Sequence, residues 1–406
     1  MNSQTPPSIA LRPVLMVCIS AMLSLAVAMG VGRFAFTPIF PLMMRDGLLT
    51  NEVGALLAAS NYMGYLVGAL LAARVRLKPL SLQALGLVGT VAVTAAVGGT
   101  STIVSWAVLR FIAGVLSAWT LVATTTWALG WLAAHGRPHL AGVVFAGVGL
   151  GIAGAGLFCL LVARPQVTAR TMWVELAVLA GAATLIPLWI GWGQPASAET
   201  APSKTAPSPR QEAAPGARGL VVCYTLFGFG YILPATYLPA LARQLVDDPQ
   251  VFGWAWPVFG TAAAISTVVV SCGLRKLDRL QVWAVSHLVM AVGVVLPVLW
   301  VSLTSVVLSA LLVGGTFMVI TMIAMQEARA RTEGNATAIL ARMTAGFAFG
   351  QLMGPVVSAA LGRLTPDHAS ALNYALALAG VGLILSALYL QYEARQKLLL
   401  KVPCHG

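Results

Sequence analysis

The sequence predicts an all-α protein that crosses a membrane twelve times, with its helices in two bundles of six. Three observations predict this fold class. Of the 406 residues, 59% are hydrophobic and only 9% are charged, against about a quarter charged in an ordinary soluble domain. About 240 apolar residues, at roughly 20 for each spanning helix, supply about twelve spans. A stretch rich in Pro, Ala and Ser divides the chain near its middle.

Twelve apolar runs are long enough to cross a bilayer. Six lie at about 15–44, 52–73, 80–98, 103–133, 140–162 and 171–192. Six more lie at about 220–242, 252–273, 280–301, 305–325, 337–361 and 371–392. Because the runs exceed about 18 residues and lack the alternation of a barrel strand, they indicate helices. We therefore predict one bundle over residues 1–192, a flexible linker over 193–219, and a second bundle with a tail over 220–406.

The net charge of +12 comes from basic residues that lie singly or in short groups between apolar runs. This spread argues against a nucleic-acid partner and predicts the topology instead. Sixteen of the Lys and Arg residues are predicted to lie on one side of the membrane: Arg12, Arg74, Arg76, Lys78, Arg137, Lys204, Arg210, Arg218, Arg275, Lys276, Arg279, Arg329, Arg331, Arg395, Lys397 and Lys401. The other side takes five: Arg45, Arg164, Arg170, Arg243 and Arg363. By the positive-inside rule, both termini and the linker are cytoplasmic in a multi-pass inner-membrane protein.

The two halves of the chain match each other at a nearly constant offset. At an offset of 198, Gly30, Gly32, Pro41 and Arg45 fall on Gly228, Gly230, Pro239 and Arg243. At an offset of 199, Gly147, Gly151 and Arg164 fall on Gly346, Gly350 and Arg363. Since six is an even number of spans, we interpret the match as a six-helix duplication in parallel orientation.

A chain of two six-helix halves with a cytoplasmic central loop resembles the major facilitator superfamily of transporters. The string GVGRFAFTPIFPLM from Gly30, SNYMGY from Ser60 and GQLMGP from Gly350 resemble its YbfB/YjiJ-type branch. The resemblance covers nearly the whole chain. It implies two bundles that rock about a site near the middle of the membrane, with spans one, four, seven and ten around a central cavity.

The chain departs from the superfamily in the loop between spans two and three, which usually reads G-x-x-x-D-R-x-G-R. Ala72 stands at the Asp position, Ala73 at the first Arg and Val75 at the Gly, and only Arg76 remains. Any gate that uses this Asp is therefore absent or remade. The span-four pattern R-x-x-x-G is present as Arg110 and Gly114; in proton-coupled relatives that Arg is associated with proton handling.

Ionisable residues inside spans are informative because each charge costs about 2.5 to 3.5 kcal/mol there and needs a partner or water. Five qualify: Arg33, Arg110, Glu175, His287 and Arg342. At 1.5 Å per residue, Arg33 lies about 15 Å and Arg110 about 10 Å from the non-cytoplasmic end of its span. We expect a packing role for His287 in peripheral span nine, and we expect Arg342 to reach water near the cytoplasmic end.

Two interpretations of the deeper arginines follow. Facing one cavity, Arg33 and Arg110 would bind an anionic group such as a carboxylate, for which guanidinium forks are suited. Alternatively they are structural, paired with Glu175 or bonded to carbonyls near Gly30 and Gly32. Glu175 is the one acidic residue inside a predicted span rather than at its edge, and it is the candidate for proton coupling; an ion pair with Arg170 or with an intramembrane arginine is the competing interpretation.

Further candidates for substrate binding are polar or amphipathic residues on spans, which could equally bridge helices. They are Asn61, Tyr62, Tyr231, Thr316 and Gln351. Tyr231 occupies the position of Arg33 in the other half, at the offset of 198.

Other function classes are less well supported. The five cysteines form no CxxC pair, and no metal-ligand or nucleophile motif is present, so we predict no cofactor, no metal and no enzyme activity. A non-transporting sensor or scaffold, or a membrane-embedded enzyme, is the alternative. The favoured interpretation is a secondary transporter, expected to be monomeric, that moves a small organic solute by alternating access. An anionic substrate and coupling to protons are hypotheses.

Overall fold

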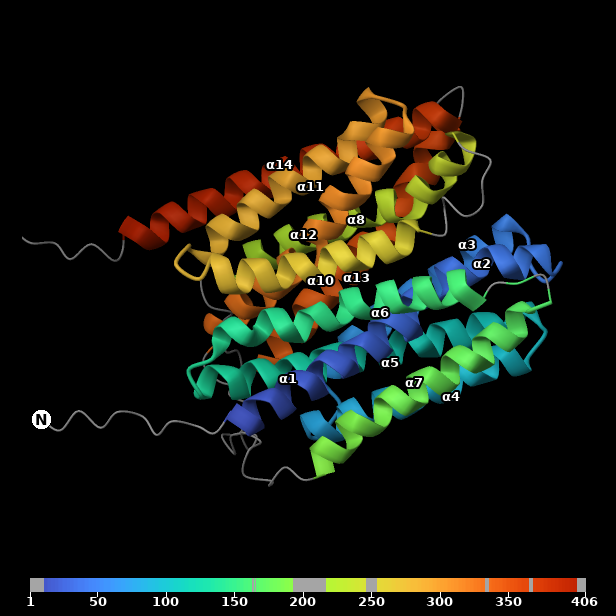
Figure 1. Ribbon diagram of the computed structural model, residues 1–406. Coiled ribbons are helices and arrows are strands. Elements are labelled where there is room, and N and C mark those ends of the chain that lie inside the picture. Colours follow the sequence, from blue (N-terminus) through green and yellow to red (C-terminus); the bar gives the residue numbers. More distant parts are fainter. Residues whose placement is uncertain are drawn as a thin grey trace, which may run out of the picture.

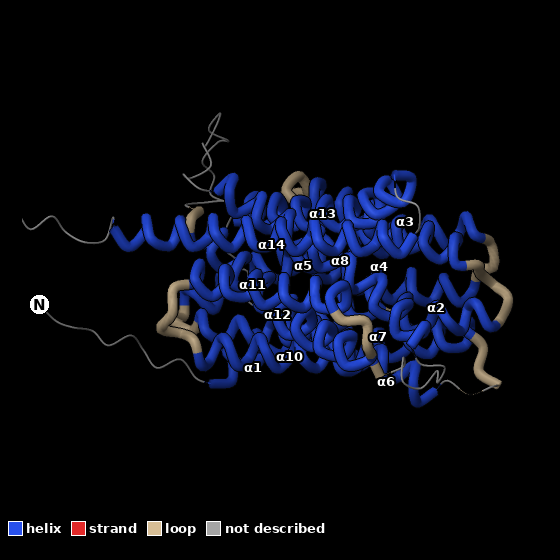
Figure 2. The backbone as a smooth tube through the Cα atoms, turned by 90° about the horizontal axis from the view of Figure 1, so that it is seen from above, coloured by secondary structure: helices blue, strands red, loops and turns tan. Residues whose placement is uncertain are grey.

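The computed structural model is helical almost throughout, and the residues that it describes are 11–162, 164, 166–192, 217–245, 254–332, 336–364 and 368–399. The helices run roughly side by side in one elongated bundle, and these residues contain no strand (Figures 1 and 2). Residues 193–216 of the predicted linker lie outside the described part, and the next helix begins at Ala217, inside the predicted linker.

The first half contains six spans. They are α1 (Leu11–Leu25), η1 (Ala26–Phe34) and α2 (Phe36–Arg45) together, then α3 (Asn51–Ala72), α4 (Pro79–Gly99), α5 (Ile103–Ala134), η2 (Pro138–Leu140) with α6 (Ala141–Val162), and α7 (Ala169–Trp192). The second half has α8 (Ala217–Leu245), α10 (Ala255–Gly273), α11 (Arg279–Leu299), α12 (Leu303–Ala330), α13 (Ala336–Leu364) and α14 (His368–Leu399). Twelve spans within the described residues are long and apolar enough to cross a membrane, which confirms the predicted number.

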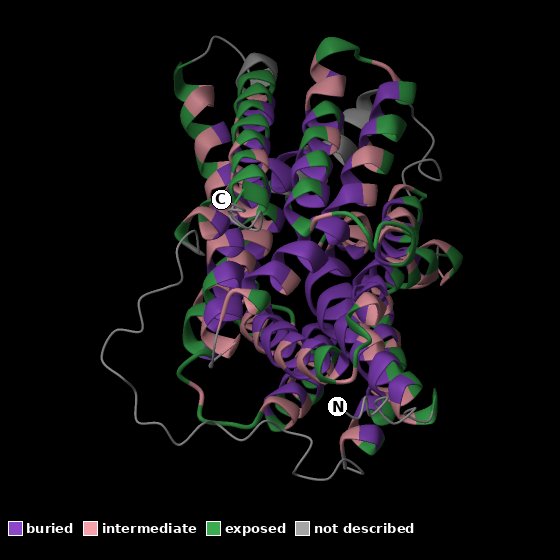
Figure 3. Ribbon diagram, turned by 90° about the vertical axis from the view of Figure 1, so that its left-hand side faces the viewer, coloured by how far each residue is buried: buried purple, intermediate pink, exposed green. Residues whose placement is uncertain are grey.

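The outer surface of the bundle is apolar. Large side chains such as Leu299 and Val104 are 79% and 74% exposed, and buried residues concentrate towards the middle of the molecule (Figure 3). A soluble monomer rarely exposes extensive apolar surface of this kind. A lipid environment accounts for it.

The helix next to each terminus reaches the same end of the bundle (Figure 1), which we call the terminal face; the opposite end is the distal face. The loops from α3 to α4 and from α10 to α11 lie at the terminal face. They carry Arg74, Arg76, Lys78, Arg275 and Lys276. Basic residues in these loops are therefore on one side of the bundle, as the sequence predicts.

The two halves pack against each other along α6 and α10. A Cβ atom on Gly149 would lie 2.4 Å from the backbone N of Ala264, and one on Gly260 would lie 2.4 Å from that of Ala153. Real Cβ atoms do not approach other atoms so closely, so these glycines allow the two backbones to touch. Small residues at such crossings are the usual device for packing helices in lipid.

The internal duplication recurs at the level of contacts. In the first half, Gly147 and Gly151 of α6 pack on the backbone of Met22 and Ala26. In the second half, Gly346 and Gly350 of α13 pack on Val221 and Thr225 of α8. Each residue of the second set lies 199 positions after its counterpart. The glycines that the offset matches therefore have the same packing role in both halves.

One extra residue distinguishes the first span from its counterpart. The contacts of α1 follow an offset of 199, whereas the sequence match of Pro41 with Pro239 needs 198. The first half thus has one more residue between Ala26 and Pro41, the interval that contains the π-helix η1. Because a π-helix bonds residues five apart instead of four, it accommodates an insertion without ending the helix.

We expect Gly30→Ala to destabilise the protein. A Cβ atom on Gly30 would lie 2.4 Å from the backbone of Gly151, so two helices would have to separate, at a cost of about 1–3 kcal/mol. Gly154→Ala is the matched control, since nothing lies within 4 Å of its added Cβ and Ala favours a helix interior by roughly 0.5–1 kcal/mol. Thermal unfolding in detergent should show a lower melting temperature for the first variant alone; equal values would contradict the packing.

Asp46 connects the first span to the start of α7. Its Oδ2 accepts a hydrogen bond of 2.7 Å from the Ala169 N–H, and Arg45 donates to its Oδ1 and to the Val167 carbonyl. Partial burial raises the pKa of the Asp46 carboxyl, but the Ala169 hydrogen bond and the adjacent Arg45 charge outweigh it, and the net pKa is lowered.

We expect Asp46→Ala to lower the free energy of unfolding at neutral pH by about 0.5–2 kcal/mol, the range typical of a hydrogen bond at a helix start. The melting temperature should fall accordingly. A carboxyl whose pKa is lower in the folded state stabilises above the pKa of the unfolded chain, about 3.9, and loses this effect as the pH falls through the folded value. Melting curves of both proteins should therefore converge on acidification. A difference independent of pH between 3 and 7 would contradict this role.

Candidate functional site

The side chain of Arg33 lies between the two halves. It belongs to η1 and is 2% exposed, and its Nη2 donates a hydrogen bond to Oε1 of Gln351 on α13. The positive charge is therefore buried in the membrane-spanning region, at the interface that must change if the halves rock against each other.

Aromatic rings surround the guanidinium of Arg33. Its Cζ lies 3.8 Å from the ring centroid of Tyr65, 5.4 Å from Phe34, 5.7 Å from Phe347 and 5.8 Å from Tyr62. Cation–π contacts of this kind contribute about 0.5–2 kcal/mol each. They stabilise a cation without neutralising it.

The ring cluster continues into the second half. Tyr231 of α8 stacks on Phe317 of α12 with a centroid distance of 4.3 Å and lies 6.0 Å from Phe347. Phe227 lies 5.1 Å from Phe347. Phe347 thus contacts both the Arg33 guanidinium and Tyr231, and it joins two residues that the sequence places at equivalent positions of the repeat.

Several hydrogen-bond donors at this site have no partner within the described protein. They are Nε and Nη1 of Arg33, Nε2 of Gln351 and the hydroxyl of Tyr231. No carboxylate among the described residues forms an ion pair with Arg33. A buried charge without a counter-charge is costly, and buried polar groups in native proteins usually have a protein, water or ligand partner. The arrangement can accept an anion with several oxygen acceptors.

Arg110 stabilises the backbone of η1. Its Nη1 donates to the Gly32 carbonyl at 3.2 Å and its Nη2 to the Arg33 carbonyl at 3.0 Å, and its Cζ lies 4.9 Å from the Phe36 ring centroid. Ser117, also on α5, donates to the Ala28 carbonyl at 2.7 Å. This geometry corresponds to the second predicted interpretation of Arg110, hydrogen bonding to carbonyls near Gly32.

Asn61 bridges two helices of the first half. Its Nδ2 donates to the Arg110 carbonyl at 2.9 Å, and it is fully buried. The backbone of Arg110, one position in the span-four pattern, is therefore fixed by α3, while its side chain fixes η1. A chain of hydrogen bonds from Asn61 through Arg110 holds the backbone on which Arg33 stands.

The remaining predicted site residues lie elsewhere. The Thr316 hydroxyl donates to the Leu312 carbonyl of its own helix at 2.7 Å, and Thr316 lines a groove on the outer side of the second half. Glu175 is half-buried on α7, and within the described residues it has neither an ion pair nor a hydrogen bond. No described contact joins it to Arg170, Arg33 or Arg110.

Two further ionisable residues of the predicted spans, His287 and Arg342, differ in burial. His287 is fully buried, accepts a hydrogen bond from Trp283 Nε1 at 2.9 Å and stacks on Phe227. Arg342 is exposed on α13.

Sequence reasoning missed Tyr65 and Phe347. Tyr65 follows Tyr62 by three positions and Phe347 precedes Gln351 by four, spacings that place side chains on one helix face. An aromatic residue one turn from a polar candidate is the signal that could have identified both.

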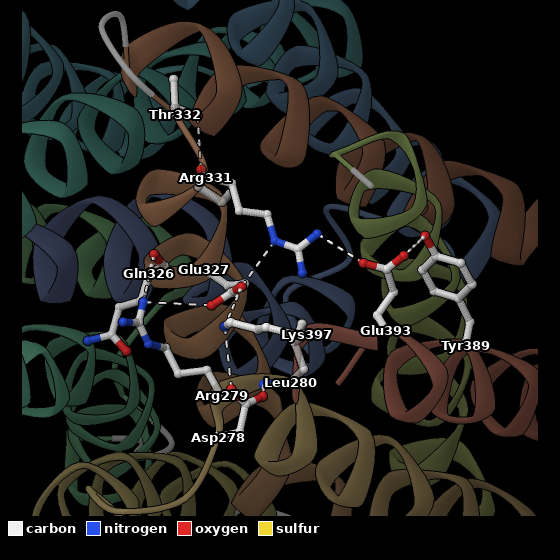
Figure 4. A network of polar contacts seen from close by, with 11 residues as sticks. Asp278, Arg279, Leu280, Gln326, Glu327, Arg331, Thr332, Tyr389, Glu393 and Lys397 are labelled. Atoms are coloured by element: carbon white, nitrogen blue, oxygen red, sulfur yellow. Dashed lines mark hydrogen bonds and ion pairs between the residues drawn. The ribbon is translucent and has the colours of Figure 1, made fainter. Parts of the chain in front are cut away.

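It also missed Glu327, because α12 continues to Ala330 rather than ending near Met325. Glu327 is 2% exposed and forms ion pairs with Arg331 at 3.0 Å, Lys397 at 3.3 Å and Arg279 at 3.8 Å (Figure 4). Glu175 is therefore not the one acidic residue on a spanning helix. The last turn of α12 is charged, so its low hydropathy hides the fact that the helix continues. The opposite charges on α11 and α14 compensate for the burial of the Glu327 carboxylate.

The contact between halves near the terminal face is largely apolar. Ala72, at the position of the superfamily's Asp, packs with Val122 and Ala341. Arg329 of α12 donates to the Thr126 carbonyl of α5 at 3.2 Å. Gln326 of α12 also donates to the Pro138 carbonyl of η2 at 3.0 Å. The gate of the superfamily's Asp is thus replaced by small apolar side chains and by two side-chain donors on backbone carbonyls.

Solved structures of major facilitator transporters share this arrangement of twelve spans in two halves. The fold is similar to the crystal structure of the human organic anion transporter MFSD10 (TETRAN), with a TM-score of 0.68 and 14% identity over 95% of this chain and 100% of that one. It is also similar to FucP, a major facilitator superfamily transporter in the outward conformation, with a TM-score of 0.66 and 13% identity over 92% and 98%.

At these identities the similarity to solved structures concerns the fold alone. Residues 25–391 match the family model described as the uncharacterised MFS-type transporter YbfB, and the chain belongs to this family. No curated protein sequence matches the chain.

Proposed function

We propose that the protein is a secondary transporter that moves a small organic anion across the inner membrane by alternating access, and that Arg33 binds the anion. The observation that carries this proposal is the guanidinium of Arg33, which is buried at the interface between the halves without a carboxylate partner and with Nε and Nη1 free of acceptors among the described residues. A carboxylate would supply both the missing acceptors and the missing counter-charge.

The proposed binding residues come from both halves. Within the described residues, Gln351 beside Arg33 and Tyr231 in its ring cluster each have a donor without a partner, and Tyr62 lies against the guanidinium. Arg110 and Asn61 act as positioning residues, because their hydrogen bonds go to the backbone of η1 and α5. A ligand held by both halves is bound differently when the halves separate, which is the requirement for alternating access.

The orientation and the coupling complete the proposal. The basic loops at the terminal face support a cytoplasmic location for that face under the positive-inside rule. Glu175 is a half-buried carboxylate without an ion pair among the described residues, which is the property expected of a group that takes up a proton from inside the membrane. Proton linkage through Glu175 is therefore the second part of the proposal.

Arg33→Gln is expected to reduce anion counterflow in proteoliposomes at least tenfold without destabilising the protein. The variant loses cation–π contacts but also loses a desolvated, unpaired charge, so its melting temperature should stay equal or rise. Arg110→Gln should reduce both transport and stability, since it leaves the Gly32 and Arg33 carbonyls without their donor.

Arg342→Gln is the control, because Arg342 is exposed on the same helix as Gln351; it should transport as the parent does. In the parent, a transported anion should raise the melting temperature, and this shift should vanish in Arg33→Gln. Parental flux in Arg33→Gln would contradict anion binding there, whereas a large loss of stability would assign the residue to the structure.

Net anion uptake is expected to depend on an imposed pH gradient, and Glu175→Gln should remove this dependence while retaining anion exchange. Exchange needs no net movement of protons, so the two assays separate coupling from binding. Both are measured in the same proteoliposomes with radiolabelled anion. Uptake by the parent that is equal with and without the gradient would exclude proton linkage.

A further inference from the structure

A groove of about 520 Å³ lies on the second half, away from the Arg33 site. Its walls come from α10, α11, α12 and α14, and most of its lining side chains are Val and Leu. Val285 and Leu277, on its rim, are 54% and 51% exposed. The groove therefore opens on the outer surface of the bundle, where lipid surrounds a protein of this class.

The charged and amide side chains of the lining lie at one end of the groove, and the hydroxyls of Ser286 and Thr316 donate to carbonyls of their own helices. Arg395 and Gln391 of α14 and Gln281 of α11 line it near the terminal face, whereas Gly315 and Val319 line its inner part on α12. The groove thus has a cationic, hydrogen-bonding end near the terminal face and an apolar end deeper in the bundle. A phospholipid in one leaflet has the same order, with its headgroup at the surface and its acyl chains inside.

The length of α14 places Arg395 at the headgroup layer. A helix of 32 residues is about 48 Å long, which exceeds the about 30 Å of the hydrocarbon core. Arg395 lies in the last turns of this helix, and the neighbouring Tyr392 is 58% exposed, as aromatic residues at the membrane interface commonly are.

The basic residues around the groove fall into two groups. Arg279, Arg331 and Lys397 have carboxylate partners (Figure 4). In the part of the chain that the structure describes, no ion pair involves exposed Arg395 or Lys276, the latter in the loop whose Leu277 lines the groove. The charge available at the mouth of the groove is therefore positive and unneutralised.

We propose that this groove is a binding site for an anionic phospholipid. The phosphate interacts with Arg395, Gln391 and Gln281 offer donors to phosphate or ester oxygens, and one acyl chain lies along the apolar wall as far as Gly315. Basic recesses between spanning helices on the cytoplasmic side are suited to anionic headgroups. This inference does not depend on the nature of the transported substrate.

The test uses the full-length protein, purified in detergent and depleted of lipid. Dioleoylphosphatidylglycerol and dioleoylphosphatidylcholine, which share acyl chains and differ in headgroup charge, are added separately in mixed micelles. Thermal unfolding and native mass spectrometry then report stabilisation and the number of lipids retained. In the parent, phosphatidylglycerol should give the larger thermal shift and at least one retained lipid that survives detergent exchange.

Two variants remove the two ends of the site. Arg395→Gln should reduce the excess shift by phosphatidylglycerol over phosphatidylcholine to less than half. Gly315→Leu should prevent retention of the lipid, because nothing lies within 4 Å of a Cβ added there and the longer side chain fills the groove. Arg342→Gln and Gly154→Leu are matched controls on other parts of the surface, and both should retain lipid as the parent does.

Equal shifts with the two lipids in the parent would overturn the proposal, as would parental lipid retention by Arg395→Gln and Gly315→Leu. A dimer that forms on lipid removal and is lost in Gly315→Leu would also overturn it, since the groove would then accommodate a second copy of the chain.

Discussion

The structure around the site depends on one constraint, which is that backbone carbonyls inside a membrane need donors. The inserted π-helix changes the register of the first span, and three carbonyls of η1, at Ala28, Gly32 and Arg33, accept hydrogen bonds from Ser117 and Arg110 of α5. One arginine thus satisfies the backbone, while Nε and Nη1 of a second arginine on that same backbone have no acceptor within the described residues. The costs of the two buried charges are met differently, the first by carbonyls and the second by aromatic rings.

The position of the insertion gives the duplicated halves different roles. The helix contacts of the first span and of α8 correspond, with Ala26 against Gly151 and Thr225 against Gly350, but η1 has a charged residue where the second half contributes Tyr231 and its ring cluster. The first half supplies the cation and the second half supplies Gln351 and Phe347 beside it. Two similar bundles thereby make one asymmetric site.

The sequence predicts the scaffold better than the contacts. Long apolar runs determine the spans, and a charge within such a run identifies Arg33 and Arg110 because its cost is visible without neighbours. The sequence offers two interpretations of Arg110, anion binding or hydrogen bonding to carbonyls near Gly32, and local pattern does not choose between them. Phe347 is more than three hundred residues from Arg33, so its contact with the guanidinium could not be inferred from local pattern. Glu327 was missed because compensating charges come from α11 and α14, which hydropathy along one helix does not detect.

The replacement of the superfamily's Asp by Ala72 has a consequence for the energetics of opening at the terminal face. Among the described residues no ion pair joins the two halves there; the contact of Ala72 with Val122 and Ala341 is apolar, and Arg329 bonds to a carbonyl. Apolar contacts carry no charge, so screening by dissolved ions changes them little. In the proposed alternating-access cycle, the balance between closed and open forms at this face should therefore depend little on ionic strength.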